Sequence, residues 1–139
     1  MSVYTQDLRY ETRGNTDILD ISRDVRSVVD ASGIKNGIVV VFAPGSTVGI
    51  TTIEYEPGLV YDLTQALQRI APEDIDYHHN ERWHDGNGHS HVRASLLGQS
   101  ETFPIVHGDI VLGTWQQIIC IDLDNRPRSR TLVVQVVGD

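Results

Sequence analysis

The amino-acid sequence predicts an α+β fold in which two main helices cover a β-sandwich-like system of mostly antiparallel sheets. Three observations lead to this prediction. The chain has 139 residues of ordinary globular composition, which is enough for one domain spanning residues 1–139. About six β-rich segments accompany only two long segments with helical periodicity. Turn sequences such as His107-Gly108-Asp109 separate neighbouring β-rich segments.

The first half of the chain predicts three strands and one helix. Apolar and charged residues alternate over residues 8–13, which indicates a half-exposed strand. Apolar residues then recur at helical spacing between Asp20, a suitable N-cap, and Gly33, a suitable stop. The continuous β-branched run 37–42 is typical of a strand buried on both faces. A further strand is expected over residues 47–54.

The second half predicts another helix, a long loop and three strands. The helix opens at Pro57 and ends before Pro72, with an apolar stripe along one face. Residues 73–88 are polar and without period, and a loop of this length is usually functional or disordered. Residues 92–97 fit a short helix. The three expected strands cover residues 102–106, 110–123 and 130–137.

Composition excludes several functional classes. A formal net charge of -8 argues against a nucleic-acid-binding surface, which needs a basic patch. The sequence has no apolar run of about 18 residues, so no membrane span is expected. Residues 1–5 lack the features of a secretory signal, and the single Cys120 excludes an internal disulfide. Cys120 lies among isoleucines and is expected in the core. These features favour a cytoplasmic protein.

The segment Asp85-Gly86-Asn87-Gly88-His89-Ser90-His91 is the strongest functional signal. Five of the six histidines lie between residues 78 and 91. In an extended segment the side chains of His89 and His91 point the same way, so both imidazoles could converge on one cation. Neutral imidazole is a common zinc ligand. The alternative, of about equal weight, is a solvated polar loop. His78 and His84 are expected on the loop surface or beside metal ligands.

Two further sets of polar residues are candidates. Glu54, at the end of a predicted strand, could orient or bind a metal, or it is a surface acid; Asp85 has the same two interpretations. In the predicted strand 110–123, alternation places Thr114 and Gln116 on one face and Trp115 on the other. The first two could fix a polar ligand. Alternatively, Trp115 packs in the core and its neighbours make hydrogen bonds across a subunit contact.

Three arginines concentrate positive charge in this acidic chain. Arg126, Arg128 and Arg130 occupy alternate positions, and in an extended segment two guanidinium groups could bind one phosphate or a neighbouring subunit's carboxylate. A solvated turn is the commoner outcome for such a group of surface charges.

Several motifs together resemble the YjbQ family, whose members are often named secondary thiamine-phosphate synthases. The matching blocks cover nearly the whole chain in the family's order. They are Gly45-Ser46-Thr47, Ile53-Glu54-Tyr55-Glu56, Tyr77-His78-His79-Asn80, Asn87-Gly88-His89-Ser90-His91, Leu97-Gly98-Gln99-Ser100, Leu112-Gly113-Thr114-Trp115-Gln116 and Arg128-Ser129-Arg130.

The resemblance implies a trimeric, β-sandwich-like α+β protein with sites near subunit boundaries. It also implies a weak thiamine-phosphate synthase activity, which joins a pyrimidine diphosphate to a thiazole phosphate with loss of pyrophosphate. His79 and His91 occupy the family's histidine positions, and Arg130 its arginine position. Many relatives carry histidine in place of Gly45, and His89 could replace that imidazole.

The chain also departs from the family pattern shortly before His91. Some relatives have an acidic pair where this chain has Gly86 and Asn87. If that pair supplies a ligand or a general acid in those relatives, this chain has moved the role to another residue or lost it.

The leading hypothesis is an enzyme acting on a small phosphorylated metabolite. The predicted catalytic residues are Glu54, His79, His91 and Arg130; the predicted ligand-binding residues are Thr114, Gln116, Arg128 and Arg130; the predicted metal ligands are His79, His89 and His91. Three imidazoles favour zinc, whereas magnesium needs oxygen ligands. The alternatives are a metal-dependent hydrolase, a trimer that binds a metal or small anion without turnover, and a trimer whose histidines only stabilise a subunit junction.

Overall fold

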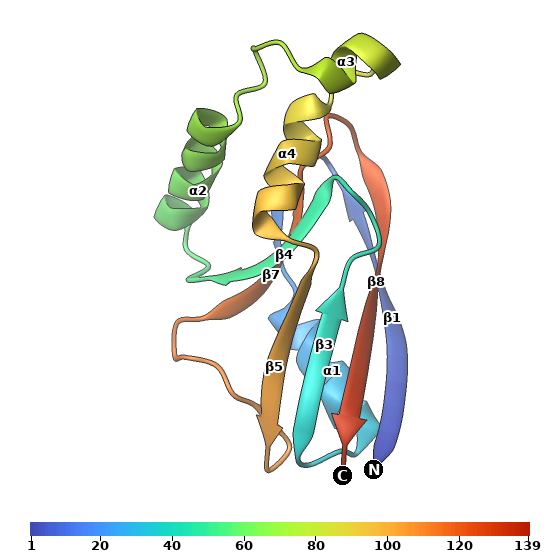
Figure 1. Ribbon diagram of the computed structural model, residues 1–139. Helices are drawn as coiled ribbons and strands as arrows, with labels where there is room; N and C mark the ends of the chain where they lie inside the picture. Colours follow the sequence, from blue (N-terminus) through green and yellow to red (C-terminus); the bar gives the residue numbers. More distant parts are fainter.

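The computed structural model describes all 139 residues as eight strands and four helices (Figure 1). In chain order these are β1 (Ser2–Thr12), β2 (Asp17–Asp20), α1 (Ser22–Ser32), β3 (Gly37–Phe42), β4 (Val48–Ile53), α2 (Pro57–Ile70), α3 (His78–Trp83), α4 (Gly88–Leu97), β5 (Ser100–Val106), β6 (Asp109–Ile110), β7 (Gln117–Asp122) and β8 (Arg128–Gly138). No helix is long and apolar enough to cross a membrane.

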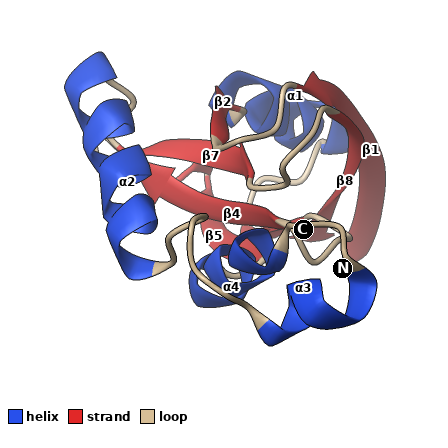
Figure 2. Cartoon of the chain, turned by 90° about the horizontal axis from the view of Figure 1, so that it is seen from above, coloured by secondary structure: helices blue, strands red, loops and turns tan.

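The strands form two antiparallel sheets, which confirms the predicted fold class. One sheet has the order β1-β8-β3-β5-β6, and the other has the order β2-β7-β4. The long ladder between β1 and β8 brings the two termini together, where the Met1 amino group lies 2.7 Å from the Asp139 carboxylate. Helix α1 lies on the opposite side of the molecule from α3 and α4 (Figure 2).

The main core lies between the larger sheet, α1 and the inner face of the smaller sheet. Val25, Val28 and Val29 of α1 are buried against Val39 and Val41 of β3, among other residues. Each fully buried side chain of this size adds about 1.5–3 kcal/mol of transfer free energy. Burial also raises the pKa of the Cys120 thiol to about 12, so the predicted core cysteine is not a thiolate nucleophile at neutral pH.

A smaller core joins α2 and α4 to the three-stranded sheet. Leu67 of α2 and Ala94 of α4 pack with Ile119 and Ile121 of β7. The predicted apolar stripe of α2 is only partly used, because Leu67 is its one buried residue and Ile70 is exposed.

The strand predicted to be buried on both faces has one exposed face. Val39 and Val41 are buried, but the side chains of Ile38 and Phe42 are each 42% exposed. The buried face packs on α1, whereas the other face is the outer surface of the larger sheet and has no cover within one chain. An apolar surface of this kind usually marks an interaction site.

The predicted strand 110–123 is interrupted. It divides into β6 and β7, and residues 111–116 between them form a turn in which the Gly113 backbone N–H donates to the Gln116 side chain. Strand alternation therefore does not apply to Thr114 and Gln116. Trp115 is 71% exposed, so the alternative interpretation, in which it packs in the core of the chain, is wrong.

The predicted loop 73–88 contains α3, and the predicted short helix begins four residues earlier, at Gly88. The Gly88 backbone N–H donates to Asn80 Oδ1 over 2.8 Å, which ties the start of α4 to α3. A Cβ atom at Gly88 would lie 2.6 Å from the Tyr77 Cβ, so this close approach requires glycine. The His-x-His segment is consequently helical rather than extended.

Candidate functional site

The side chains of His89 and His91, which would converge in an extended segment, are separated because both residues belong to helix α4. Successive residues in an α-helix are about 100° apart around the axis, so His89 and His91 point to nearly opposite faces. His89 is buried beside Tyr77, with ring centroids 6.4 Å apart, while His91 is half-buried. The predicted ligand set of His79, His89 and His91 is therefore not assembled within one chain.

His91 instead pairs with His79 of α3. The ring centroids are 4.3 Å apart with planes tilted by 39°, a true side-chain contact. His79 Nδ1 lies 3.5 Å from an Asp85 carboxylate oxygen, but it is buried and makes no hydrogen bond. His78 and His84 are exposed, as predicted for loop-surface histidines.

The surroundings of His91 favour its neutral form. Burial lowers the pKa of His91, and the neighbouring imidazole of His79 lowers it further, while the carboxylates of Asp124 and Asp85 act in the opposite direction. An imidazole that is neutral near pH 7 can accept a proton or bind a metal.

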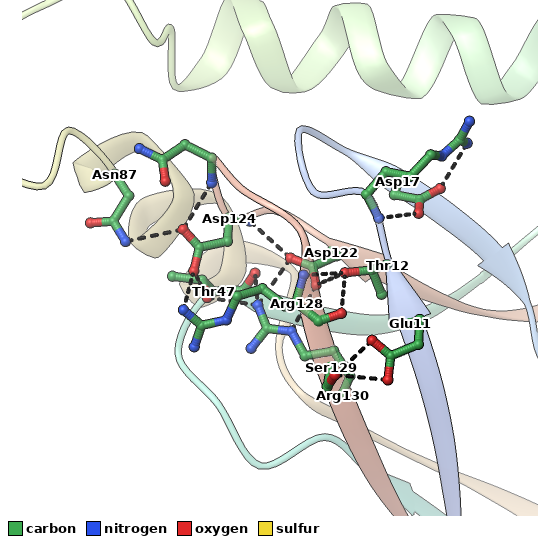
Figure 3. A network of polar contacts seen from close by, with 12 residues as sticks. Glu11, Thr12, Asp17, Thr47, Asn87, Asp122, Asp124, Arg128, Ser129 and Arg130 are labelled. Carbon is green, nitrogen blue, oxygen red and sulfur yellow. Dashed lines mark hydrogen bonds and ion pairs between the residues drawn. The ribbon is translucent and has the colours of Figure 1, made fainter.

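Asp124 connects Asn87, at the start of α4, to Thr47 and Arg128 (Figure 3). Its carboxylate accepts hydrogen bonds from Asn87 Nδ2 at 3.2 Å, Thr47 Oγ1 at 3.1 Å and the Asn125 backbone at 2.8 Å, and it lies 3.3 Å from Arg128 Nη1. Burial alone would raise the pKa of Asp124, but these hydrogen bonds and the Arg128 charge lower it below its ordinary value. Asn87 immediately precedes α4, so its hydrogen bond to Asp124 fixes the start of the helix that carries His91.

Arg130 is bound to a second buried carboxylate. Its Nε and Nη2 atoms donate to the two Asp122 oxygens at 2.8 and 2.9 Å, and Nη2 also donates to Thr47 Oγ1 at 2.8 Å (Figure 3). Thr12 donates a further hydrogen bond to Asp122. The third guanidinium nitrogen of Arg130, Nη1, takes no part in the ion pair. It lies close to Gly45, where an added Cβ atom would be 3.1 Å from it.

The two arginines of β8 therefore have different roles. Their side chains lie on the same side of the strand, as alternation predicts. Arg128 pairs with Asp124, and Arg130 pairs with Asp122. Arg130 is buried and bound to Asp122 and Thr47, whereas the Arg128 side chain is 33% exposed and accessible to a ligand. Arg126 is exposed, as expected for a solvated turn.

The remaining predicted site residues lie at the other end of the smaller sheet. Gln116 Nε2 donates to Thr52 Oγ1 at 2.9 Å, and exposed Glu54 follows the end of β4. Thr47 precedes the start of β4, and a strand rises about 3.3 Å per residue, so Glu54 is roughly 20 Å from the Thr47 end. Thr114, Gln116 and Glu54 do not meet the histidine pair within one chain.

Sequence reasoning missed four residues of this network, Thr47, Asn87, Asp122 and Asp124. The missed signal is that two carboxylates at alternate positions precede two arginines at alternate positions by four and eight residues, so that the turn between them can bring each arginine back to one carboxylate.

The donor atoms of one chain do not surround a position for the predicted zinc ion. No group of three or more histidine, cysteine or carboxylate side chains is placed to hold a metal ion. His79 and His91 supply two imidazoles, and His89 faces away. The residues of one chain therefore do not fit a complete three-histidine zinc site.

Comparison with known proteins identifies close relatives over the whole chain. The family model described as UPF0047 protein YjbQ-like matches residues 6–139. A UPF0047 protein of Methanothermobacter thermautotrophicus is 43% identical over 138 residues, covering 99% of this chain and 94% of that protein. The crystal structure of a YbjQ-like protein from Sulfolobus solfataricus has a TM-score of 0.95 at 34% identity, with 99% of each chain covered. A protein from Aeropyrum pernix has a TM-score of 0.91 at 29% identity, with 100% of each chain covered.

Proposed function

This chain belongs to the UPF0047 family of YjbQ-like proteins, and we propose that it is a thiamine-phosphate synthase-like enzyme acting on small phosphorylated metabolites. The observation that carries the proposal is the contact between the imidazoles of His79 and His91, 4.3 Å apart. Arg128 supports it, because its partly exposed guanidinium is held by Asp124, which also anchors the start of α4.

These groups suit the chemistry of the proposed condensation. A bond forms between the pyrimidine methylene carbon and the thiazole nitrogen, while the carbon–oxygen bond to the diphosphate breaks and pyrophosphate leaves with the electron pair. A positive group beside the departing oxygens stabilises the charge that develops there. Arg128 would provide that charge, and the His79–His91 pair would exchange a proton with a phosphate oxygen.

The proposed enzyme is a homotrimer. The outer face of the larger sheet exposes apolar side chains that a second copy would cover, including Ile38, Phe42 and Val106. Assembly would also explain why the predicted site residues lie at two separate places in one chain, at the two ends of the smaller sheet. Glu54, Thr114 and Gln116 would reach a histidine pair only if that pair belonged to another subunit.

Separately, we propose that the assembled trimer binds a metal ion. His79 and His91 would be two ligands, and imidazole favours zinc over magnesium. Metal analysis of the purified trimer tests this directly: zinc bound in the wild type and lost in His79→Asn and His91→Asn supports the proposal. Equal metal content in the wild type and both variants contradicts it.

The synthase proposal is tested by mixing the purified protein with a pyrimidine diphosphate and a thiazole phosphate and measuring the joined product. We expect product with the wild type and a decrease of about 100-fold or more in His91→Asn, the usual effect of losing an acid–base group. His84→Asn is the matched control, because His84 is exposed with φ of 57°, a conformation that asparagine tolerates.

Two results would contradict the synthase proposal. One is the absence of product with any divalent ion. The other is release of phosphate from the diphosphate without joined product, which would indicate the metal-dependent hydrolase instead.

A further inference from the structure

We propose that a polar cavity on the opposite face of α4 binds a small oxyanion, the carboxylate or phosphate group of a metabolite, through Arg93 and His89. The cavity has a volume of about 270 Å³ and no hydrophobic residue in its lining. It lies between α2, α4 and the loop that joins β1 to β2. This site is separate from the His79–His91 pair and does not depend on the synthase proposal.

Arg93 is a buried cation without a carboxylate partner. Its side chain donates to the Ala71 carbonyl at 2.9 Å, to Gln68 Oε1 at 2.7 Å and to Thr16 Oγ1 at 3.3 Å. All three acceptors are neutral, and Arg93 forms no ion pair although it is only 5% exposed. Buried charges are normally paired, and a guanidinium has five N–H donors, so two remain for a ligand.

His89 also lines this cavity, and its ring has a polar atom without a partner. The residue is 2% exposed, and its Nδ1 atom is buried without a hydrogen-bond partner. The Ser90 hydroxyl lies 3.5 Å from the other ring nitrogen, Nε2. If Ser90 donates to Nε2, Nδ1 carries the proton and can donate it to a bound anion. Buried polar atoms almost always have a partner, so a ligand atom is expected there.

The charges around the cavity suit an anion of low charge. Burial lowers the pKa of His89, and Arg93 lowers it further, so the imidazole is neutral near pH 7 and acts as a hydrogen-bond donor. Glu73 also lines the cavity and is exposed. Its carboxylate would repel a bound anion, so replacing it with a neutral residue should strengthen binding.

Nuclear magnetic resonance of ¹⁵N-labelled histidine side chains tests the proposal. The intact protein is titrated with sodium acetate, sodium phosphate and, as the ionic-strength control, sodium chloride. We expect a saturable shift of the His89 ring signals with acetate or phosphate and none with chloride. A response to acetate alone identifies a carboxylate ligand, and a stronger response to phosphate identifies a phosphate ligand.

Variants separate the site from general charge effects. Arg93→Gln should weaken binding by at least about tenfold, the effect of losing a charge-assisted hydrogen bond. Arg69→Gln, an exposed change on α2, should leave binding unchanged, and Glu73→Gln should strengthen it. If Arg93→Gln does not fold, calorimetry on His89→Gln replaces it, with reduced binding expected. Absence of a saturable His89 shift in the wild type, or wild-type affinity in Arg93→Gln or His89→Gln, overturns the proposal.

Discussion

The imidazoles of His79 and His91 are in contact although they belong to different helices, α3 and α4. The contact depends on hydrogen bonds made by two asparagine side chains near the histidines. Asn80 Oδ1 accepts from the Gly88 backbone N–H, and Asn87 donates to the buried carboxylate of Asp124. The histidine pair is thus held by the same polar network that joins β7 and β8.

Arg128→Gln should impair substrate binding more than folding. The Arg128 side chain is 33% exposed, and without it the buried Asp124 carboxylate keeps its hydrogen bonds from Asn87, Thr47 and Asn125, so the substitution should change the free energy of unfolding by about 1 kcal/mol or less. If Arg128 binds a substrate phosphate, KM should rise about tenfold or more. Steady-state kinetics of Arg128→Gln and of the exposed control Arg126→Gln check this. An equal KM in the two variants would remove Arg128 from the site.

Arg130→Gln should have the opposite profile, with a large loss of stability. The substitution leaves the buried Asp122 carboxylate without its cation, and breaking a buried pair in this way costs about 3–5 kcal/mol. Urea denaturation measures the change, with Arg126→Gln expected within about 0.5 kcal/mol of the wild type. A similarly small effect for Arg130→Gln would show that the buried ion pair is not structural.

The buried carboxylates should make the protein sensitive to acid. Burial would raise the pKa of Asp122, but hydrogen bonds from Arg130, Thr12 and the Asp124 backbone lower it below its ordinary value of 3.8. A carboxyl whose pKa is lower in the folded state adds stability above the unfolded pKa and loses it as the pH falls through the folded value. The free energy of unfolding should therefore decrease below about pH 4, and this decrease should be smaller in Asp122→Asn.

The outer face of the larger sheet should control assembly. Ile38→Ser combined with Phe42→Ser removes apolar area from this face without touching the buried residues of β3. Light scattering coupled to size-exclusion chromatography should find a trimer for the wild type and smaller species for the double variant. Asp62→Asn, an exposed change on α2 and away from this face, should keep the wild-type mass. A monomeric wild type would contradict the trimer proposal.

Local patterns predicted the secondary structure where one rule dominated. The helical spacing before Gly33 and the β-branched run 37–42 gave α1 and β3 with nearly correct limits. Prediction failed in the segment 110–123, because the Gly113–Gln116 turn interrupts an otherwise apolar, β-rich sequence. It also failed at the His-x-His segment, because the contact of Asn80 with Gly88, between residues distant in sequence, stabilises the start of a helix there.

In the candidate site, too, sequence patterns identified residues, but the contacts between them depend on the fold. The importance of His79 and His91 came from motif resemblance, whereas their contact depends on the packing of α3 against α4. The roles of Arg128 and Arg130 could not be separated from sequence, since both occupy equivalent alternate positions. Both carboxylates are buried, and the exposure of the arginine side chains, 6% for Arg130 against 33% for Arg128, distinguishes the structural arginine from the accessible one.

The titration of His91, followed by nuclear magnetic resonance, tests most directly whether the two imidazoles act as one pair. In the wild type we expect a His91 pKa below its ordinary value of 6.5, because burial and the neighbouring His79 both lower it. In His79→Asn the pKa of His91 should rise toward 6.5, and in His84→Asn it should match the wild type. An identical His91 titration in the wild type and His79→Asn would contradict the account.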